Sequence, residues 1–155
     1  MKRLNVVSRL GAAVVSAGLI LSSGAAYAEG DENPAVSYRA SVMDAILWNS
    51  NYFFGMLTGK VEYDAEQAQM RAANIKALAS MPWEAFGADT QGTASSALDT
   101  VWSDPEGFQA AAAAFLEAVN ELEAAAGEGE SAAKLAGAKM GGTCSKCHDT
   151  YRQKD

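Results

Sequence analysis

Apolar residues recur at three- and four-residue steps along much of this chain, and this helical period is the strongest constraint on its fold. In the segment from about Pro34 to Leu57, the residues that follow the period are Val36, Met43, Ile46, Phe53 and Leu57. The segment stops at Thr58-Gly59. Alternating runs of Val, Ile and Thr and Asn-Gly hairpin turns are absent from the sequence, which therefore predicts an all-α fold.

Helix start and stop signals divide the rest of the chain into three further helices. A second helix is expected to begin at Asp64, whose carboxylate can cap it while Gln67 reaches back as in a capping box. It ends before Pro82, which cannot continue a helix. Its core positions are predicted to be Ala68, Ala72, Ile75 and Leu78.

The third helix opens at "SDPE", where Ser103 or Asp104 is expected to cap it and Glu106 to complete a capping box. An apolar stripe with alternating four- and three-residue spacing follows, formed by Phe108, Ala112, Phe115, Val119, Leu122 and Ala126. Such a narrow stripe is typical of the seam of a helix bundle. After a break at "GEGE", the fourth helix is expected from about Ser131 to Arg152. We therefore expect an antiparallel up-down-up-down four-helix bundle, with one long connection over residues 82–102.

The first residues have the composition of a secretory signal. Lys2, Arg3 and Arg9 precede an apolar run that ends in small residues with an A-x-A cleavage site, Ala26-Tyr27-Ala28. A membrane-anchoring helix is the alternative, but Gly and Ser interrupt the run. We therefore predict a cleaved signal peptide over residues 1–28 and one domain over residues 29–155. The mature protein is expected in the periplasm, without insertion into the membrane.

The charge of the chain limits its partners. Its formal net charge is −7, and removal of the predicted signal would take away only positive charges. Such an acidic protein is repelled by phosphate backbones, so nucleic acid is not expected as a partner. A redox partner protein with a basic docking face is compatible with this charge.

Both cysteines and the only histidine of the chain lie in five consecutive residues near its end, "CSKCH". Cys144, Cys147 and His148 could form a redox dithiol, part of a metal site or an anchor for a covalent cofactor. A redox CxxC is typical of a strand–helix junction, and no sheet is predicted here. A structural zinc site needs four ligands, usually Cys and His, and only three such residues are present. A disulfide between Cys144 and Cys147 would close a very small loop and stabilise little.

The remaining interpretation is C-x-x-C-H, the attachment signature of c-type haem. Two thiols bond the vinyl groups of the haem and the adjacent imidazole binds its iron. On a helix, Cys144, Cys147 and His148 lie at positions i, i+3 and i+4 and share one face. The predicted export agrees, because such haem is attached outside the cytoplasm. The sequence therefore predicts one covalent haem c.

A haem motif in the last helix of a bundle, "CSKCHDTYR", resembles the class II cytochromes, and specifically the cytochrome c prime family. The resemblance covers nearly the whole mature chain. It includes "SYRASVM" in the first helix, "GKVEYDAE" at the turn into the second, "SMPWEAFG" after it, and "VWSD" before the third. Two departures are Ala40, where many members have Gln, and "LDTVW" before the third helix. The resemblance implies a periplasmic, usually homodimeric haem protein.

The resemblance also implies roles for particular residues. His148 would be the proximal iron ligand, Met43 would cover the distal face of the haem, and Arg39 would lie beside a propionate. The remaining implied haem neighbours are Trp83, Phe86 and Arg152. A solvated surface residue is the alternative for Arg39, and ordinary core packing is the alternative for Trp83 and Phe86.

Two functions are compatible with these residues. In the first, five-coordinate iron binds small neutral gases such as NO or CO and exchanges electrons. In the second, Met43 is a sixth iron ligand and the protein is a low-spin electron carrier. We do not expect an enzyme, because peroxide chemistry needs a distal base and the only histidine is proximal. Trp48 and Tyr52, with Ala45 beside them, form an apolar patch on the first helix that predicts a homodimer.

Overall fold

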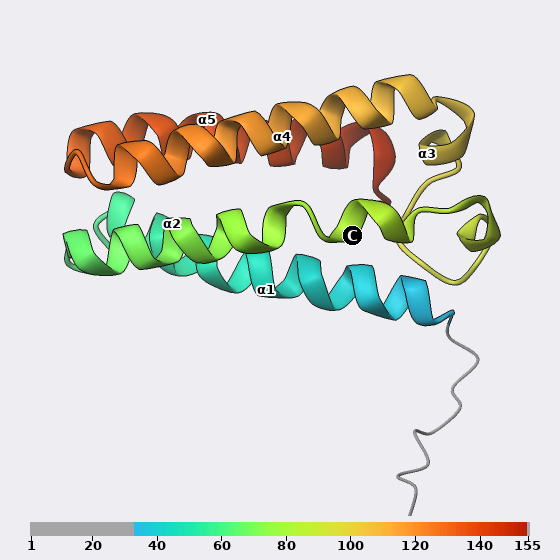
Figure 1. Ribbon diagram of the computed structural model, residues 1–155, viewed down its shortest axis with the longest axis horizontal. Helices are drawn as coiled ribbons and strands as arrows, with labels where there is room; N and C mark the ends of the chain where they lie inside the picture. Colours follow the sequence, from blue (N-terminus) through green and yellow to red (C-terminus); the bar gives the residue numbers. More distant parts are fainter. Residues whose placement is uncertain (1–32, 155) are drawn as a thin grey trace, which may run out of the picture.

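Four long helices form the molecule, as Figure 1 shows in a computed structural model that describes residues 33–154. They are α1 (Pro34–Leu57), α2 (Ala65–Ala79), α4 (Pro105–Ala126) and α5 (Glu130–Tyr151). The pair α1 and α2 packs against the pair α4 and α5, and consecutive long helices run in opposite directions. No strand occurs within these residues, so the predicted all-α antiparallel bundle is confirmed. The predicted signal peptide lies outside the described part of the chain.

The predicted caps of α2 and α4 agree with the structure. The carboxylate of Asp64 accepts a hydrogen bond from Gln67 N at 2.9 Å and caps α2. Asp104 caps α4 in the same way, through a bond of 3.1 Å from Gly107 N. The predicted capping box with Glu106 is wrong, because the box needs its acidic residue three positions after the cap and Glu106 is only two away.

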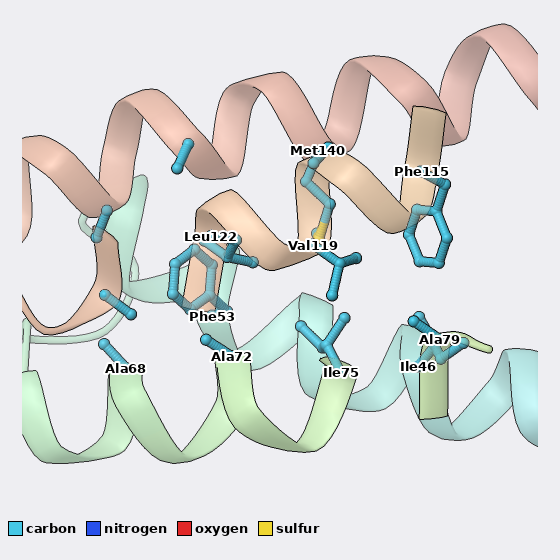
Figure 2. Packing of buried hydrophobic residues seen from close by; sticks show 14 of the residues in the cluster. Ile46, Phe53, Ala68, Ala72, Ile75, Ala79, Phe115, Val119, Leu122 and Met140 are labelled. Atoms are coloured by element: carbon cyan, nitrogen blue, oxygen red, sulfur yellow. The ribbon is translucent and has the colours of Figure 1, made fainter. Parts of the chain in front are cut away.

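The main core lies between the two helix pairs (Figure 2). The stripe predicted for the third long helix is confirmed, since all six of its residues are buried. On α1 the prediction is partly wrong, because Val42 and Met56 are buried while Val36, Met43 and Leu57 are only partly covered. On α2 the buried position is Ala79 and Leu78 is half-buried. The neighbouring helices decide which of two adjacent residues is covered.

Glycines on α5 allow α1 to approach it closely. A Cβ atom at Gly137 would lie 2.7 Å from Leu57 Cδ1 and 2.9 Å from Phe53 Cε1. One turn later, a Cβ atom at Gly141 would lie 3.3 Å from Phe54 Cζ. These contacts fix the distance between the two helices just before α5 reaches Cys144.

The connection between α2 and α4 contains three short helices, η1 (Pro82–Ala85), η2 (Ala88–Thr90) and α3 (Thr100–Ser103). It folds over the end of the bundle where α1 begins and α5 ends (Figure 1). Backbone hydrogen bonds join it to the chain end, from Leu98 N to Tyr151 O at 3.0 Å and from Gln153 N to Ser96 O at 2.7 Å. These bonds terminate α5 at Tyr151, one residue earlier than predicted. Arg152 is already extended, with φ −124° and ψ 139°.

None of the helices within residues 33–154 combines the length and the apolar character needed to cross a bilayer.

Candidate functional site

The last two turns of α5 carry the cysteines and the histidine. Cys144 and Cys147 are half-buried free thiols, and His148 is accessible to solvent. Cys144 packs against the main core. Cys147 instead packs against a second apolar cluster centred on Val101, Phe108 and Tyr151. The motif therefore lies where the two clusters meet, at the end of the bundle covered by the connection.

The surroundings of the two thiols keep them protonated. Burial raises the pKa of Cys144, and burial together with the neighbouring sulfur raises the pKa of Cys147. Both lie near the carboxyl end of α5, where the helix dipole also disfavours a thiolate. A redox dithiol needs the opposite, a thiol with a lowered pKa. The arrangement does not favour redox exchange.

The imidazole of His148 is suited to binding a metal. Partial desolvation, and then the positive charge of Arg152, lower the pKa of His148, while Asp149 opposes them. The ring is therefore neutral at neutral pH and keeps a lone pair for a metal. Residues 33–154 contain no group of three or more His, Cys, Asp and Glu side chains that could hold an ion. His148 is thus suited to a metal that brings its other ligands with it, as haem iron does.

Arg152 lies close to His148, although it is outside the helix. Its backbone N–H donates to the carbonyl of His148 at 3.2 Å. Arg152 also pairs with Ala97 of the connection in an isolated antiparallel β-bridge. Arg152 therefore joins the connection directly to the last turn of α5.

Trp83 and Phe86 belong to an aromatic cluster beside Cys147. The two rings are stacked with centroids 6.4 Å apart, and both meet Phe108 edge-on at 5.9 and 4.9 Å. The indole N–H of Trp83 donates to Ala79 O at 2.7 Å. Phe108 in turn contacts the ring of Tyr151 at 5.3 Å. The connection thus supplies one apolar wall near the haem motif.

Arg39 is buried, with 5% of its surface exposed, so the alternative of a solvated surface residue is wrong. Its Nη1 donates to Ala85 O at 2.7 Å and to Thr90 Oγ1 at 2.9 Å, and its Nη2 donates to Ser95 Oγ at 3.0 Å. The guanidinium lies 4.3 Å from the centre of the Phe86 ring.

Burial lowers the pKa of Arg39, and no carboxylate within residues 33–154 lies within ion-pair distance of it. A buried charge without a counter-ion is unfavourable. A haem carries two propionates, and one of them would supply the missing negative charge. The residues at this end of the bundle therefore fit a haem.

Met43 is placed on α1 one turn after Arg39. It is half-buried and packs against the main core, which Cys144 also contacts. Met43 on α1 and Cys144 on the neighbouring helix α5 thus contact the same cluster.

Several residues that form contacts in this region were not predicted from the sequence. Thr90 and Ser95 bind Arg39, and Tyr151 donates a hydrogen bond of 2.8 Å to Asp104. Only Tyr151 had a usable signal in the sequence, because its position three residues after His148 places it near the same helix face. The partners of Arg39 lie in the irregular connection, for which helical periodicity gives no prediction.

Comparisons with known proteins agree with this geometry. The sequence profile of the family described as Cytochrome C' matches residues 34–152. Cytochrome c' of Rubrivivax gelatinosus is 38% identical over 122 residues, which cover 77% of this chain and 95% of the relative. Its crystal structure superposes with a TM-score of 0.74 at 36% identity, covering 77% of this chain and 94% of its own.

A nitric oxide complex of a mutant cytochrome c prime from Alcaligenes xylosoxidans superposes with a TM-score of 0.73 at 32% identity, covering 78% of this chain and 94% of its own. A carbon monoxide-bound variant of the same protein has the same TM-score and identity, and covers 77% and 94%. The chain described here therefore belongs to the cytochrome c prime family, whose members bind haem c covalently through cysteines, and Cys144 and Cys147 are its two cysteines.

Proposed function

We propose that this protein binds small neutral gases, NO and CO, at a five-coordinate haem iron whose only protein ligand is His148. The observation that carries the proposal is a neutral, accessible imidazole directly after two attachment cysteines, with no group of ligating side chains around it in the described chain. A haem bound here would supply the iron, and His148 would be its protein ligand.

The side chains around the motif would hold the haem in a fixed orientation. Cys144 and Cys147 would anchor the haem through thioether bonds. Arg39 is suited to pairing with a propionate, because its buried charge otherwise lacks a counter-ion in residues 33–154. Trp83 and Phe86 would pack along the ring, since they line the cluster that Cys147 contacts.

The distal side would be covered by Met43 without a bond to the iron. An apolar side chain there disfavours anions and admits uncharged diatomic molecules. The NO and CO complexes of related proteins support this ligand class. A polar donor or base for peroxide chemistry is not expected, so the proposed role is binding and electron exchange rather than catalysis.

Ligation of the iron by Met43 is the second candidate function. It is favoured by the half-buried position of the thioether against the cluster that Cys144 also contacts. Such a bond would produce a low-spin electron carrier with a raised reduction potential.

Absorption spectra of the oxidised and reduced protein distinguish the two functions. The proposal expects high-spin spectra in both states, no near-infrared band of a methionine–iron bond, and CO binding to the ferrous form. A low-spin spectrum that becomes high-spin in Met43→Ala would establish the six-coordinate carrier instead.

We further propose that the protein acts as a homodimer. Trp48 on α1 is 70% exposed and Tyr52, one turn later, is 38% exposed. The ring of Tyr52 is partly covered by the guanidinium of Arg71, at 4.4 Å from the ring centre. Trp48 does not fold back over its own helix, so an apolar surface remains for a second copy of the chain.

The proposed location is the periplasm, on the basis of the predicted signal over residues 1–28. There the acidic protein would exchange electrons with a partner that has a basic docking face. Fractionation of cells that express the full chain tests the location, and a haem-bearing protein retained in the cytoplasm would contradict it.

A further inference from the structure

The last turn of α5 carries a buried tyrosine that the proposed function does not use. Tyr151 follows His148 by three residues and Cys147 by four, and only 8% of its surface is exposed. Its ring contacts Phe108 edge-on, in the cluster against which Cys147 also packs. Its hydroxyl donates a hydrogen bond to Asp104 Oδ2 at 2.8 Å.

The acceptor of this hydrogen bond is the cap of α4. Oδ1 of Asp104 accepts from Gly107 N at 3.1 Å, while Oδ2 accepts from Tyr151. One carboxylate therefore joins the first turn of α4 to the last turn of α5. Because its capping bond holds the side chain in one conformation, the second oxygen presents a fixed acceptor to the phenol.

Gly107 provides the space for this contact. A Cβ atom at this position would overlap both the hydroxyl of Tyr151 and the carboxylate of Asp104, closer than real Cβ contacts occur. Helices favour Ala over Gly, so a glycine in the first turn of α4 has no explanation in helix propensity. The contact between Tyr151 and Asp104 explains it.

Other bonds hold the same turn from the side of the connection. Thr100 Oγ1 donates to Thr150 O at 2.7 Å, and Leu98 N donates to Tyr151 O at 3.0 Å. The acceptors of both bonds are backbone carbonyl oxygens of α5. The bond between Tyr151 and Asp104 instead ties a side chain of this turn to the start of α4.

We propose that Tyr151 and Asp104 are positioning residues for His148, which hold the last turn of α5 against the start of α4. The bond between Tyr151 and Asp104 fixes the helical turn that also carries His148, and the imidazole then keeps one orientation toward the iron. The inference rests on the proposed function in one respect, namely that His148 is the iron ligand.

The iron–histidine stretching band of the ferrous holoprotein, measured by resonance Raman spectroscopy, tests the inference. Tyr151→Phe removes only the hydroxyl and keeps the ring in its cluster. We expect this variant to retain its haem and to show a broader band, shifted to lower frequency. Tyr38→Phe is the matched control, because Tyr38 also donates to a carboxylate, Glu84 at 3.3 Å, but does so from α1. Its band should equal that of the parent.

Asp104→Ser separates positioning from capping. Serine is a good helix cap, but its single hydroxyl is too short to reach the phenol as well. We expect this variant to reproduce the change seen in Tyr151→Phe. The double variant should add no further shift, since both substitutions remove the same bond.

Two results would overturn the inference, and they are distinguishable. A normal band in Tyr151→Phe, with unchanged frequency and width, would show that the hydrogen bond does not orient His148 and would leave the proposed function intact. A parent protein without any iron–histidine band would overturn the assignment of His148 as ligand, and the positioning role with it.

Discussion

At the scale of single residues, the site consists of groups whose surroundings set their chemistry. Burial keeps Cys144 and Cys147 as thiols, and desolvation with the charge of Arg152 keeps His148 neutral. A neutral imidazole keeps the lone pair with which it can bind haem iron. Arg39 is the opposite case, a buried cation whose hydrogen bonds all go to neutral oxygens.

Removal of a cysteine tests the attachment. We expect Cys144→Ala and Cys147→Ala to weaken or abolish it, because each thiol forms one of the two bonds to the haem. Protein from a periplasmic host with haem maturation should keep its colour after acid-acetone extraction, and the variants should lose it in part or completely. His148→Ala should keep the colour and lose the axial ligand. A colourless parent with two alkylatable thiols would contradict covalent haem.

Truncation of Met43 tests the distal side. We expect Met43→Ala to bind CO faster in the ferrous form, because the ligand no longer displaces a side chain, while the spectrum before CO stays high-spin. Stopped-flow mixing with CO measures this rate. Met70→Ala is a matched control, since Met70 lies exposed on α2, and it should leave the rate unchanged. An equal rate in parent and Met43→Ala would show that Met43 does not cover the iron.

At the scale of helices, the two halves of α5 have different roles. Its first half uses small residues to pack closely, and its last two turns carry the haem motif. The position of the second half depends on the first, because Gly137 and Gly141 set the approach of α1 directly before Cys144.

Alanine substitutions at these glycines measure that dependence. In an unconstrained helix, Gly→Ala stabilises by about 1 kcal/mol. At Gly137 the added Cβ would overlap Leu57 and Phe53, so we expect a net loss of about 1–3 kcal/mol from overpacking. Gly141→Ala is the matched control, because its nearest contact is a milder 3.3 Å. Denaturant unfolding compares the two, and equal stability of both variants would contradict this account of the packing.

At the scale of the whole molecule, the connection between α2 and α4 joins the two sides of the haem site. It accepts the hydrogen bonds of Arg39 on α1 through Ala85, Thr90 and Ser95. A few residues later it pairs with the chain end that follows His148. One irregular segment therefore relates α1 to α5, although these helices are the first and the last of the bundle.

The proposed homodimer also concerns the whole molecule, and a substitution in its apolar surface tests it. We expect Trp48→Glu to shift a dimer at tens of micromolar toward monomer, because it places a charge in the centre of the apolar surface. Sedimentation velocity measures the shift. Leu135→Glu is the matched control, because Leu135 is 77% exposed on α5, in the other helix pair, and should leave the dimer intact. A parent protein that sediments as a monomer, or a dimer unaffected by Trp48→Glu, would contradict the proposal.

The sequence predicted the long helices well, and the reasons are local. The bounds of α1 agree at both ends, and α2 and α4 begin at the expected caps, Asp64 and Asp104. Caps, proline and glycine act within one helical turn, so they can be recognised without knowledge of the rest of the molecule. The same holds for the haem motif, whose three residues belong to one helix face.

The tertiary structure alone decided which hydrogen bonds are formed around that motif. The burial of Arg39, its bonds to Thr90 and Ser95, and the contact between Tyr151 and Asp104 join residues about fifty positions apart in the chain. The choice between neighbouring positions on α1, such as Val42 and Met43, was settled in the same way. A short-range period fixes a helix face only to within about one residue, and the identity of the contacts depends on how the other helices and the connection fill the space around it.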